Sequence, residues 1–179
     1  MSVKKDSVLL VSDTHGCVEP LAAVFRWAAA QGLEQGLFLG DGLGDIDAAA
    51  ERTGTSIAWQ SVRGNMDDEG PLSVVAEFAG RRLYLAHGQG FQLDLGFDIL
   101  AACARAAGAE AALFGHTHVP FFGFFDNMAF LNPGSVGRPR SRFGTSFAVL
   151  ELPGTGPLSA EFWGISKTRS EYAIKPLVF

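Results

Sequence analysis

The sequence predicts an α/β fold in which two β-sheets pack face to face and helices cover their outer faces. Short apolar runs alternate with helical patterns in the first half of the chain, which favours a largely parallel, covered sheet. Two pairs of runs in the second half are typical of antiparallel strands, so a second sheet is expected there. The 22 glycines and 8 prolines among 179 residues indicate many turns.

Six apolar runs in the first two thirds of the chain have the length of buried strands. They are Ser7–Val11, Gly36–Leu39, Ile57–Val62, Leu72–Phe78, Arg82–Ala86 and Ala111–Phe114. Helical patterns lie between several of these runs. We therefore expect consecutive strands to run in the same direction where a helix separates them.

Three helices are expected. Pro20–Gln31 has apolar residues at helical spacing, with Pro20 suited to the first turn and Gly32 to the end. Asp45 is expected to cap a second helix that runs to Arg52. A third helix is expected where four residues share an apolar face, namely Phe97, Leu100, Ala101 and Ala104.

The second half of the chain contains two candidate hairpins. Phe121–Phe125 and Met128–Leu131 flank the turn Asp126-Asn127. Phe147–Leu152 and Leu158–Ile165 flank a turn rich in glycine and proline. Both pairs are expected to be antiparallel.

A dense group of phenylalanines lies in and beside the first of these hairpins: Phe121, Phe122, Phe124, Phe125 and Phe130. Because successive residues of a strand alternate between its two faces, some of these rings should point outward. An exposed patch would mark an interface or a wall of a substrate site, whereas burial between the sheets would leave no patch. Both interpretations stay open here, and an exposed patch would be compatible with a homo-oligomer.

Composition and charge restrict the class of protein. Hydrophobic residues make up 47% of the chain and charged residues 18%, against roughly 25% charged residues in an average protein. We expect one globular domain over residues 1–179. The formal charge is 14 − 19 = −5, so binding of a long nucleic-acid backbone is not expected.

The cellular compartment follows from what the sequence lacks. No apolar stretch is long enough to span a bilayer, and the apolar run after residues 1–6 is too short for a signal peptide. Cys17 and Cys103 form no CxxC pair, so free thiols in a reducing cytosol are expected. We therefore expect a cytoplasmic protein that contacts no membrane.

Polar side chains follow five of the predicted strands, each beside a glycine, and all four histidines of the chain are among them. These residues are Asp13, His15, Asp41, Asn65, His87, His116 and His118. In open α/β sheets, ligands bind outside the carboxyl ends of the strands, so these side chains should converge on one cleft.

The seven side chains have the chemistry of a metal site. Two carboxylates, four imidazoles and one amide are too many ligands for one four-coordinate zinc. They suit two divalent cations that share a bridging carboxylate, at a separation of roughly 3.5–4 Å. Mixed imidazole and oxygen ligands favour Mn, Fe, Zn, Co or Ni over Ca or Mg.

Each motif taken alone also has an ordinary structural interpretation. Gly-Asp41 and Gly-Asn65 are common in turns, and His87 could be a hydrogen-bonded structural histidine. Gly-His116-Thr-His118 is more specific, because alternate residues of an extended segment point the same way. The shared placement of all these residues at strand ends favours the metal site.

In chain order, these motifs resemble those of the calcineurin-like metallophosphoesterase superfamily. Asp-x-His, Gly-Asp, Gly-Asn-x-Asp, His-Gly and Gly-His-x-His all occur in sequence. The segments 62–67 and 131–135 are similar to the small prokaryotic phosphodiesterase branch. The resemblance implies the metallo-dependent phosphatase fold, a four-layer αββα sandwich of two mixed sheets flanked by helices.

The resemblance also implies roles for the site residues. One cation would be held by Asp13, His15 and His118, and the other by Asn65, His87 and His116. Asp41 would bridge the two, and Asp41, Asn65 and His116 would serve catalysis. The implied activity is hydrolysis of small phosphate diesters by a bridging hydroxide, with two divalent ions of which manganese is favoured.

The sequence departs from many relatives after Asn65, where they carry a histidine that protonates the leaving group. Here that residue is Met66, which has no proton to donate. Asp67 could substitute as an acid only if its side chain faced the site, and as the next residue along it is expected to point elsewhere. Gln89 stands where the branch often has a second histidine. We therefore expect a preference for activated or aryl diesters over alkyl monoesters.

The nearby polar residues have less specific roles. Arg138 and Arg140 could clamp a phosphate or lie on the surface. Asp45 and Asp47 are expected to cap a helix rather than to support the site. Asn132 and Ser135 are expected to set the geometry of a loop beside the cleft.

Other functions remain as alternatives to a phosphodiesterase. The retromer scaffold subunit has the implied fold with an eroded metal site, so the fold alone does not specify chemistry. All seven positions here keep a residue that can bind metal, which favours the enzyme. A nucleotide phosphatase or nuclease is a further alternative, although the negative charge disfavours a nucleic-acid partner. A small phosphate ester is the expected substrate.

Overall fold

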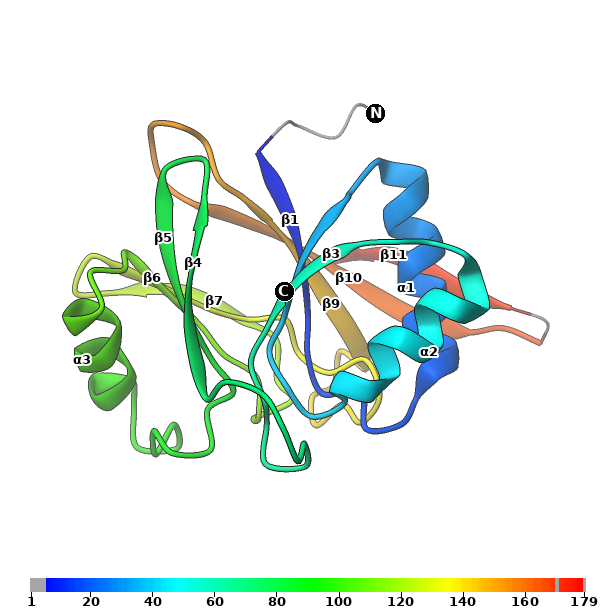
Figure 1. Cartoon of the computed structure of the whole chain (residues 1–179), viewed down its shortest axis with the longest axis horizontal. Coiled ribbons are helices and arrows are strands. Elements are labelled where there is room, and N and C mark those ends of the chain that lie inside the picture. The colour runs from blue at the N-terminus through cyan, green and yellow to red at the C-terminus, as the bar shows by residue number, and fades with distance from the viewer. Residues whose placement is uncertain (1–5, 170, 179) are drawn as a thin grey trace.

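A computed structural model describes residues 6–169 and 171–178. Two β-sheets pack against each other, with helices on both outer faces (Figure 1). This is the four-layer α/β architecture that we predicted. Residues 1–5, part of the segment for which no signal peptide is expected, lie outside the described residues.

The first sheet has six strands in the order β11-β10-β9-β1-β2-β3. The parallel half consists of β1 (Ser7–Val11), β2 (Gln35–Phe38) and β3 (Ala58–Ser61). The antiparallel half consists of β9 (Thr145–Glu151), β10 (Ser159–Lys167) and β11 (Tyr172–Leu177). The two halves meet where β1 pairs with β9. Because β1 and β2 are parallel neighbours, their carboxyl ends lie side by side.

The second sheet has five strands in the order β4-β5-β6-β8-β7. Its strands are β4 (Ser73–Phe78), β5 (Arg81–Ala86), β6 (Ala111–Leu113), β7 (Phe121–Phe125) and β8 (Met128–Asn132). The β7–β8 hairpin turns at Asp126 and Asn127, whose φ angles of 47° and 61° are those of a type I′ turn. The predicted hairpin is thus confirmed.

The partition of the C-terminal strands differs from our expectation. The hairpin β7–β8 joins the second sheet, whereas β9 and β10 extend the first sheet beside β1. An alternating apolar pattern identifies a strand and its buried face but not its partner, which explains the error. The edge strand β11 was not predicted, because no side chain of Tyr172–Leu177 is fully buried and the apolar signal is weak.

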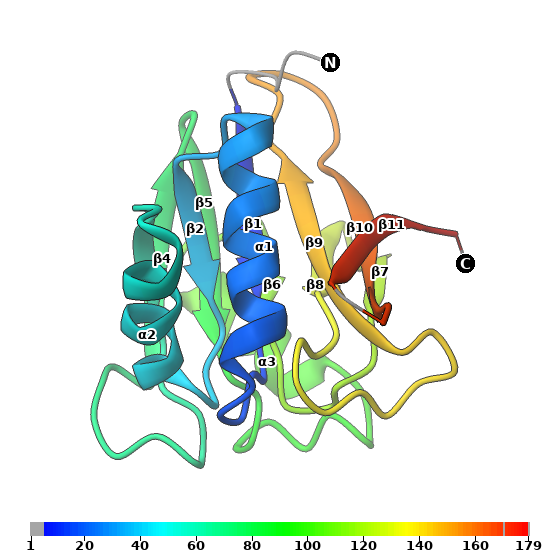
Figure 2. The same cartoon turned by 90° about the vertical axis from the view of Figure 1, so that its right-hand side faces the viewer.

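Helices cover both outer faces. The first sheet carries α1 (Val18–Gln31) and α2 (Leu43–Thr53), and the second carries α3 (Asp98–Ala106). Figure 2 shows α1 and α2 in front of the first sheet, with the connections that follow β1, β3 and β5 at one end of the molecule. Within the described residues, none of the helices is long and apolar enough to cross a bilayer.

Candidate metal centre

Hydrogen bonds between backbones join the predicted strand-end loops in pairs. The loop after β1 is bonded to the loop after β2, since Asp13 N–H donates to the Gly40 carbonyl over 2.9 Å and His15 N–H to the Asp41 carbonyl over 3.0 Å. In the second sheet, Gly115 N–H donates to the His87 carbonyl over 2.8 Å. The loops therefore hold their side chains at one end of the sandwich.

Asp13 lies at the centre of the cluster and is fully buried. Its Oδ2 accepts hydrogen bonds from Ser12 Oγ over 2.6 Å and from His116 N–H over 3.1 Å, so it links the two sheets. Its Oδ1 accepts no hydrogen bond. That oxygen faces the imidazoles of three histidines.

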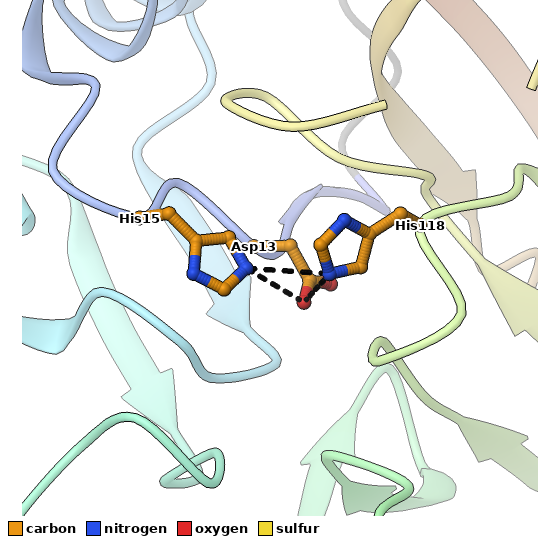
Figure 3. Close-up of side chains that lie close together, drawn as sticks. All are labelled: Asp13, His15 and His118. Carbon is orange, nitrogen blue, oxygen red and sulfur yellow. Dashed lines mark hydrogen bonds and ion pairs between the residues drawn. The ribbon is translucent and has the colours of Figure 1, made fainter. Parts of the chain in front are cut away.

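The first group of possible ligands consists of Asp13, His15 and His118. Figure 3 shows their side chains directed toward one another. His118 Nε2 lies 3.0 Å from Asp13 Oδ1 and 3.2 Å from His15 Nε2. The other ring nitrogen of His118 donates to the carbonyl of Arg138. This bond fixes the ring so that Nε2 points into the group.

The second group consists of Asp13, Asp41 and His87. His87 Nδ1–H donates to the Leu39 carbonyl over 2.6 Å, which leaves Nε2 as the acceptor nitrogen. That nitrogen is buried without a hydrogen-bond partner and lies 3.4 Å from Asp41 Oδ2. The same Asp41 oxygen lies 3.6 Å from His15 Nε2. Asp41 therefore contacts both groups.

This donor set fits divalent cations. A buried carboxylate oxygen and a buried imidazole nitrogen that both lack hydrogen-bond partners are costly unless something positive lies between them. Each group offers three ligand atoms within 4.8 Å of one another. Imidazole nitrogens oriented by backbone carbonyls are the usual ligands of transition metals in proteins.

The pKa values of the histidines agree with this assignment. Burial lowers the pKa of His15 and, together with the neighbouring His87, that of His116, so both rings are neutral near pH 7. Burial also acts to lower the pKa of His118, but the adjacent Asp13 carboxylate outweighs it and raises that pKa. A cation bound here would take the place of the His118 proton.

Backbone strain is concentrated at the site. Nine described residues other than glycine have positive φ angles. Five of them are predicted ligands: Asp13, His15, Asp41, His116 and His118. Such conformations cost about 1–3 kcal/mol each and persist where the surroundings enforce them, most often at functional sites.

Two motif glycines are required by close approach. A Cβ on Gly64 would lie 2.0 Å from Asp41 Oδ1, and one on Gly115 would lie 2.1 Å from Ser12 Oγ and 2.8 Å from Asp13 Oδ2. Both distances are far below van der Waals contact. These two glycines therefore make room for the carboxylates of Asp41 and Asp13.

Two predicted site residues stand apart from these groups. The ring of His116 packs edge-on against that of His87, with centroids 5.3 Å apart, and belongs to neither group of ligands. Asn65 lies between Gly64 and Met66, whose N–H groups bind Asp67 and Asp41, but its own side chain is exposed. The ligand roles of His116 and Asn65 therefore stay predictions.

The loop after β8 supports the site as predicted. Ser135 Oγ donates to the Asp13 carbonyl over 2.7 Å, and Asn132 Nδ2 donates to the Gly115 carbonyl over 2.7 Å. Both side chains are buried. They hold the two ligand loops to the β8 connection.

Comparison with known proteins supports the resemblance seen in the motifs. The profile of the calcineurin-like phosphoesterase superfamily domain matches residues 7–155. The chain belongs to this superfamily. A probable metallophosphoesterase of Bacillus subtilis (strain 168), YsnB, is 26% identical over 148 residues, which cover 82% of this chain and 84% of YsnB.

Solved structures share the fold of this superfamily member. A predicted phosphoesterase from Streptococcus pneumoniae TIGR4 superposes with a TM-score of 0.76 at 22% identity, covering 98% of this chain and all of that one. Vps29 from Chaetomium thermophilum superposes with a TM-score of 0.75 at 20% identity, covering 97% of this chain and 96% of that one. These likenesses confirm the predicted fold class.

The cap of α2 corrects the prediction for Asp45. The helix begins at Leu43, and the carboxylate that binds its N-terminus is Asp67, from the loop after β3. Asp67 accepts N–H donors from Asp41, Gly42, Leu43 and Gly64 over 2.7–2.9 Å. A helix N-terminus can be capped from any loop that reaches it, which no local sequence pattern reveals.

Asp45 supports the site instead. Its carboxylate accepts hydrogen bonds from Thr14 Oγ1 and Gly16 N–H, on either side of His15. It therefore ties the first turn of α2 to the loop that carries His15. Asp47 is exposed on the same helix.

We expect Asp67→Asn to lower the free energy of unfolding by about 1–3 kcal/mol at pH 7, because one acceptor oxygen becomes a donor that faces N–H groups. Burial acts to raise the pKa of Asp67, but its four N–H donors outweigh burial and lower it below the ordinary 3.8. Its stabilising effect is therefore present above about pH 4 and lost as the pH falls through the lowered pKa. Urea denaturation at several pH values measures this.

The exposed neighbour Asp68 provides the control, because among the described residues its hydrogen bond, from Arg63, goes to the backbone carbonyl rather than to the carboxylate. Asp68→Asn should unfold like the wild type at every pH. Equal stability of Asp67→Asn and Asp68→Asn at pH 7 would contradict the role assigned to Asp67.

Proposed function

We propose that this protein is a metal-dependent phosphodiesterase that hydrolyses small phosphate diesters at a site for two divalent cations. The observation that carries the proposal is the pair of buried, unpartnered atoms, Asp13 Oδ1 and His87 Nε2, within two overlapping groups of ligands. Membership of the calcineurin-like phosphoesterase superfamily supports the same chemistry.

The ligands divide between the two cations by their position. Asp13, His15 and His118 form one group, and Asp41 and His87 belong to the other. We assign Asn65 and His116 to the second cation, because their loops border Asp41 and His87. Asp41 Oδ2 faces histidines of both groups, which supports a bridging role.

The ligand chemistry restricts which metals suit the site. Four imidazoles with carboxylate oxygens suit manganese, iron, zinc, cobalt or nickel, and we favour manganese. A Vps29 structure from Entamoeba histolytica, 20% identical to this chain, contains zinc, which supports a divalent cation in this fold. When bound, two such cations neutralise charge on the phosphate and lower the pKa of water.

The residues around the cations determine which substrates react. Arg138 and Arg140 have exposed side chains. Burial is the main cause of the lowered pKa values of His15 and His116, and the charge of Arg138 adds to it at His15 and that of Arg140 at His116. Their positive charge beside the histidines of the site supports a role in binding a phosphate. The backbone of the same segment orients His118, since Arg140 N–H donates to its carbonyl over 3.2 Å.

On the loop after β3, the residue that follows Asn65 is not a proton donor. Met66 is 68% exposed there and carries no proton to give. Asp67 is turned away toward the N-terminus of α2, and its lowered pKa keeps it ionised near pH 7. The enzyme should therefore favour leaving groups that depart without protonation, such as aryl alcohols.

A non-catalytic scaffold with the same fold is the second candidate. Vps29 structures among the neighbours support it, because they share the architecture over nearly the whole chain. The two overlapping groups of ligand atoms favour the enzyme. The free thiols of Cys17 and Cys103 support a location in the cytosol. The charge of −5 supports a small substrate rather than a nucleic acid.

The proposal is tested by loading the protein with Mn²⁺, Zn²⁺, Ni²⁺ or Co²⁺ and measuring hydrolysis of bis(p-nitrophenyl) phosphate, alkyl monoesters and nucleotides. We expect the aryl diester to react fastest. Asp41→Asn should reduce kcat/KM by more than about 100-fold, beyond the usual loss from an outer-shell partner. Asp47→Asn is the matched control, because Asp47 is exposed on α2.

Three outcomes would contradict the proposal. An alkyl monoester that reacts faster than the aryl diester would refute the preference. Equal activity of Asp41→Asn and Asp47→Asn would refute the bridging role. A protein that binds the ions without hydrolysing any substrate would favour the scaffold.

Met66→His tests the missing proton donor. Because Met66 is exposed, a histidine there should fold normally and face the substrate. We expect the rate with an alkyl leaving group to rise, by up to the 10²–10⁴-fold range of general acid catalysis, while the aryl rate changes little. Equal changes with both leaving groups, measured as kcat across a series of leaving-group pKa values, would contradict this account.

A further inference from the structure

Strand β7 exposes an uncharged aromatic edge. Its five residues read Phe-Phe-Gly-Phe-Phe, and Phe121, Phe124 and Phe125 are 38%, 57% and 43% exposed. Phe122 packs into the core between the sheets, and Phe130 of β8 is fully buried. The phenylalanine group is therefore buried in part and forms an exposed patch in part, so each of the two interpretations holds for some of its residues.

The backbone of β7 is also open on one side. The strand is the last of its sheet, and it pairs only with β8 among the described residues. Natural edge strands are usually protected by a lysine, an inward charge, a proline or a bulge. None of these occurs within Phe121–Phe125, so the edge is suited to pairing with another strand.

The register of the hairpin fixes which backbone groups face outward. In antiparallel pairing, hydrogen-bonded pairs alternate with non-bonded ones. Phe125 and Met128 flank the two-residue turn and form a bonded pair, as do Gly123 and Phe130 two residues on. The N–H and C=O groups of Phe122 and Phe124 therefore point away from β8.

We propose that β7 pairs antiparallel with β7 of a second copy of this chain, about a two-fold axis at Gly123. The strand reads the same in both directions, so the axis places Phe122 opposite Phe124 of the second copy and Phe121 opposite its Phe125. The outward groups of Phe122 and Phe124 then bond to each other across the axis. Two five-stranded sheets become one continuous sheet.

The glycine at the axis fits this arrangement. Gly123 would face its counterpart in a non-bonded pair, where the Cα atoms approach to about 4.5 Å. A Cβ at Gly123 would already lie 3.0 Å from the ring of Phe121, which covers it on the same face. Four cross-strand phenylalanine pairs then surround the axis, two on each face.

Charge selects this orientation over a parallel one. Asp126 follows the strand directly. The antiparallel arrangement separates the two copies of Asp126 to opposite ends of the ladder, whereas parallel pairing in register would set them side by side. Like charges directly opposite one another are destabilising.

The available area predicts a weak, exchanging dimer. At roughly 200 Å² per ring, the exposed parts of the three phenylalanines sum to roughly 300 Å² per copy. A stable interface buries about 800 Å² per partner. The four backbone hydrogen bonds and neighbouring contacts add to the ring surface, so we expect a dissociation constant in the micromolar range.

Sedimentation equilibrium from about 5 µM to about 500 µM tests the proposal, because this range spans a weak interface. We expect wild type to pass from monomer to dimer. Phe124→Lys should raise the dissociation constant at least about tenfold, as loss of a central aromatic contact does. Leu72→Lys is the matched control, because Leu72 is 60% exposed and precedes β4 at the opposite edge of the same sheet. It should dimerise like wild type.

A charge pair tests the register independently. Phe121→Lys alone and Phe125→Glu alone should each weaken the dimer. The double variant should restore it, because each lysine would face a glutamate of the other copy at both ends of the ladder. Within one chain these residues lie too far apart along the strand to pair.

Some outcomes would overturn the proposal. Wild type that stays monomeric at about 500 µM would exclude the dimer and leave the edge to a strand of another protein. A dimer that Phe124→Lys and Leu72→Lys affect equally would place the interface elsewhere. A double variant no better than its parents would refute the register. None of these measurements depends on the metal centre.

Discussion

A buried carboxylate oxygen without a hydrogen-bond donor among the described residues is the constraint on which this structure depends. Asp13 Oδ1 lies within the protein, faces three imidazoles and accepts no hydrogen bond. Desolvating such an oxygen is unfavourable unless a cation or a proton compensates it. The site is therefore suited to binding a cation, and the surrounding elements hold its residues in position.

Backbone geometry and hydrogen bonds to the backbone set the positions of the ligand residues. Ligand residues adopt positive φ angles, and the glycines beside them allow carboxylates to approach the main chain. Asp67 and Asp45 use their charges to hold the N-terminus of α2 against the ligand loops. The polar groups that orient the ligands thus lie in the segments after β1, β2, β3 and β8, and the two sheets supply the rigid frame.

The sequence predicts the frame and the ligands for clear physical reasons. Apolar periodicity locates the strands. The placement of seven polar residues after strands predicts that they converge, and five of them lie in two overlapping groups, Asp13 with His15 and His118, and Asp13 with Asp41 and His87. The roles of Asp45 and Asp67 could not be predicted, because each binds backbone groups of a loop distant in sequence. The two antiparallel hairpins were predicted correctly, whereas the sheet that β9 and β10 join was not, because periodicity does not specify pairing between distant strands.

The most direct test of the metal site is a crystal structure of the protein grown with manganese, with anomalous scattering used to locate the ions. The account predicts two peaks, one within bonding distance of Asp13, His15 and His118 and the other at Asp41 and His87, with Asp41 in contact with both. A map without peaks at these side chains, with His118 still paired to Asp13 as it is in Figure 3, would contradict it.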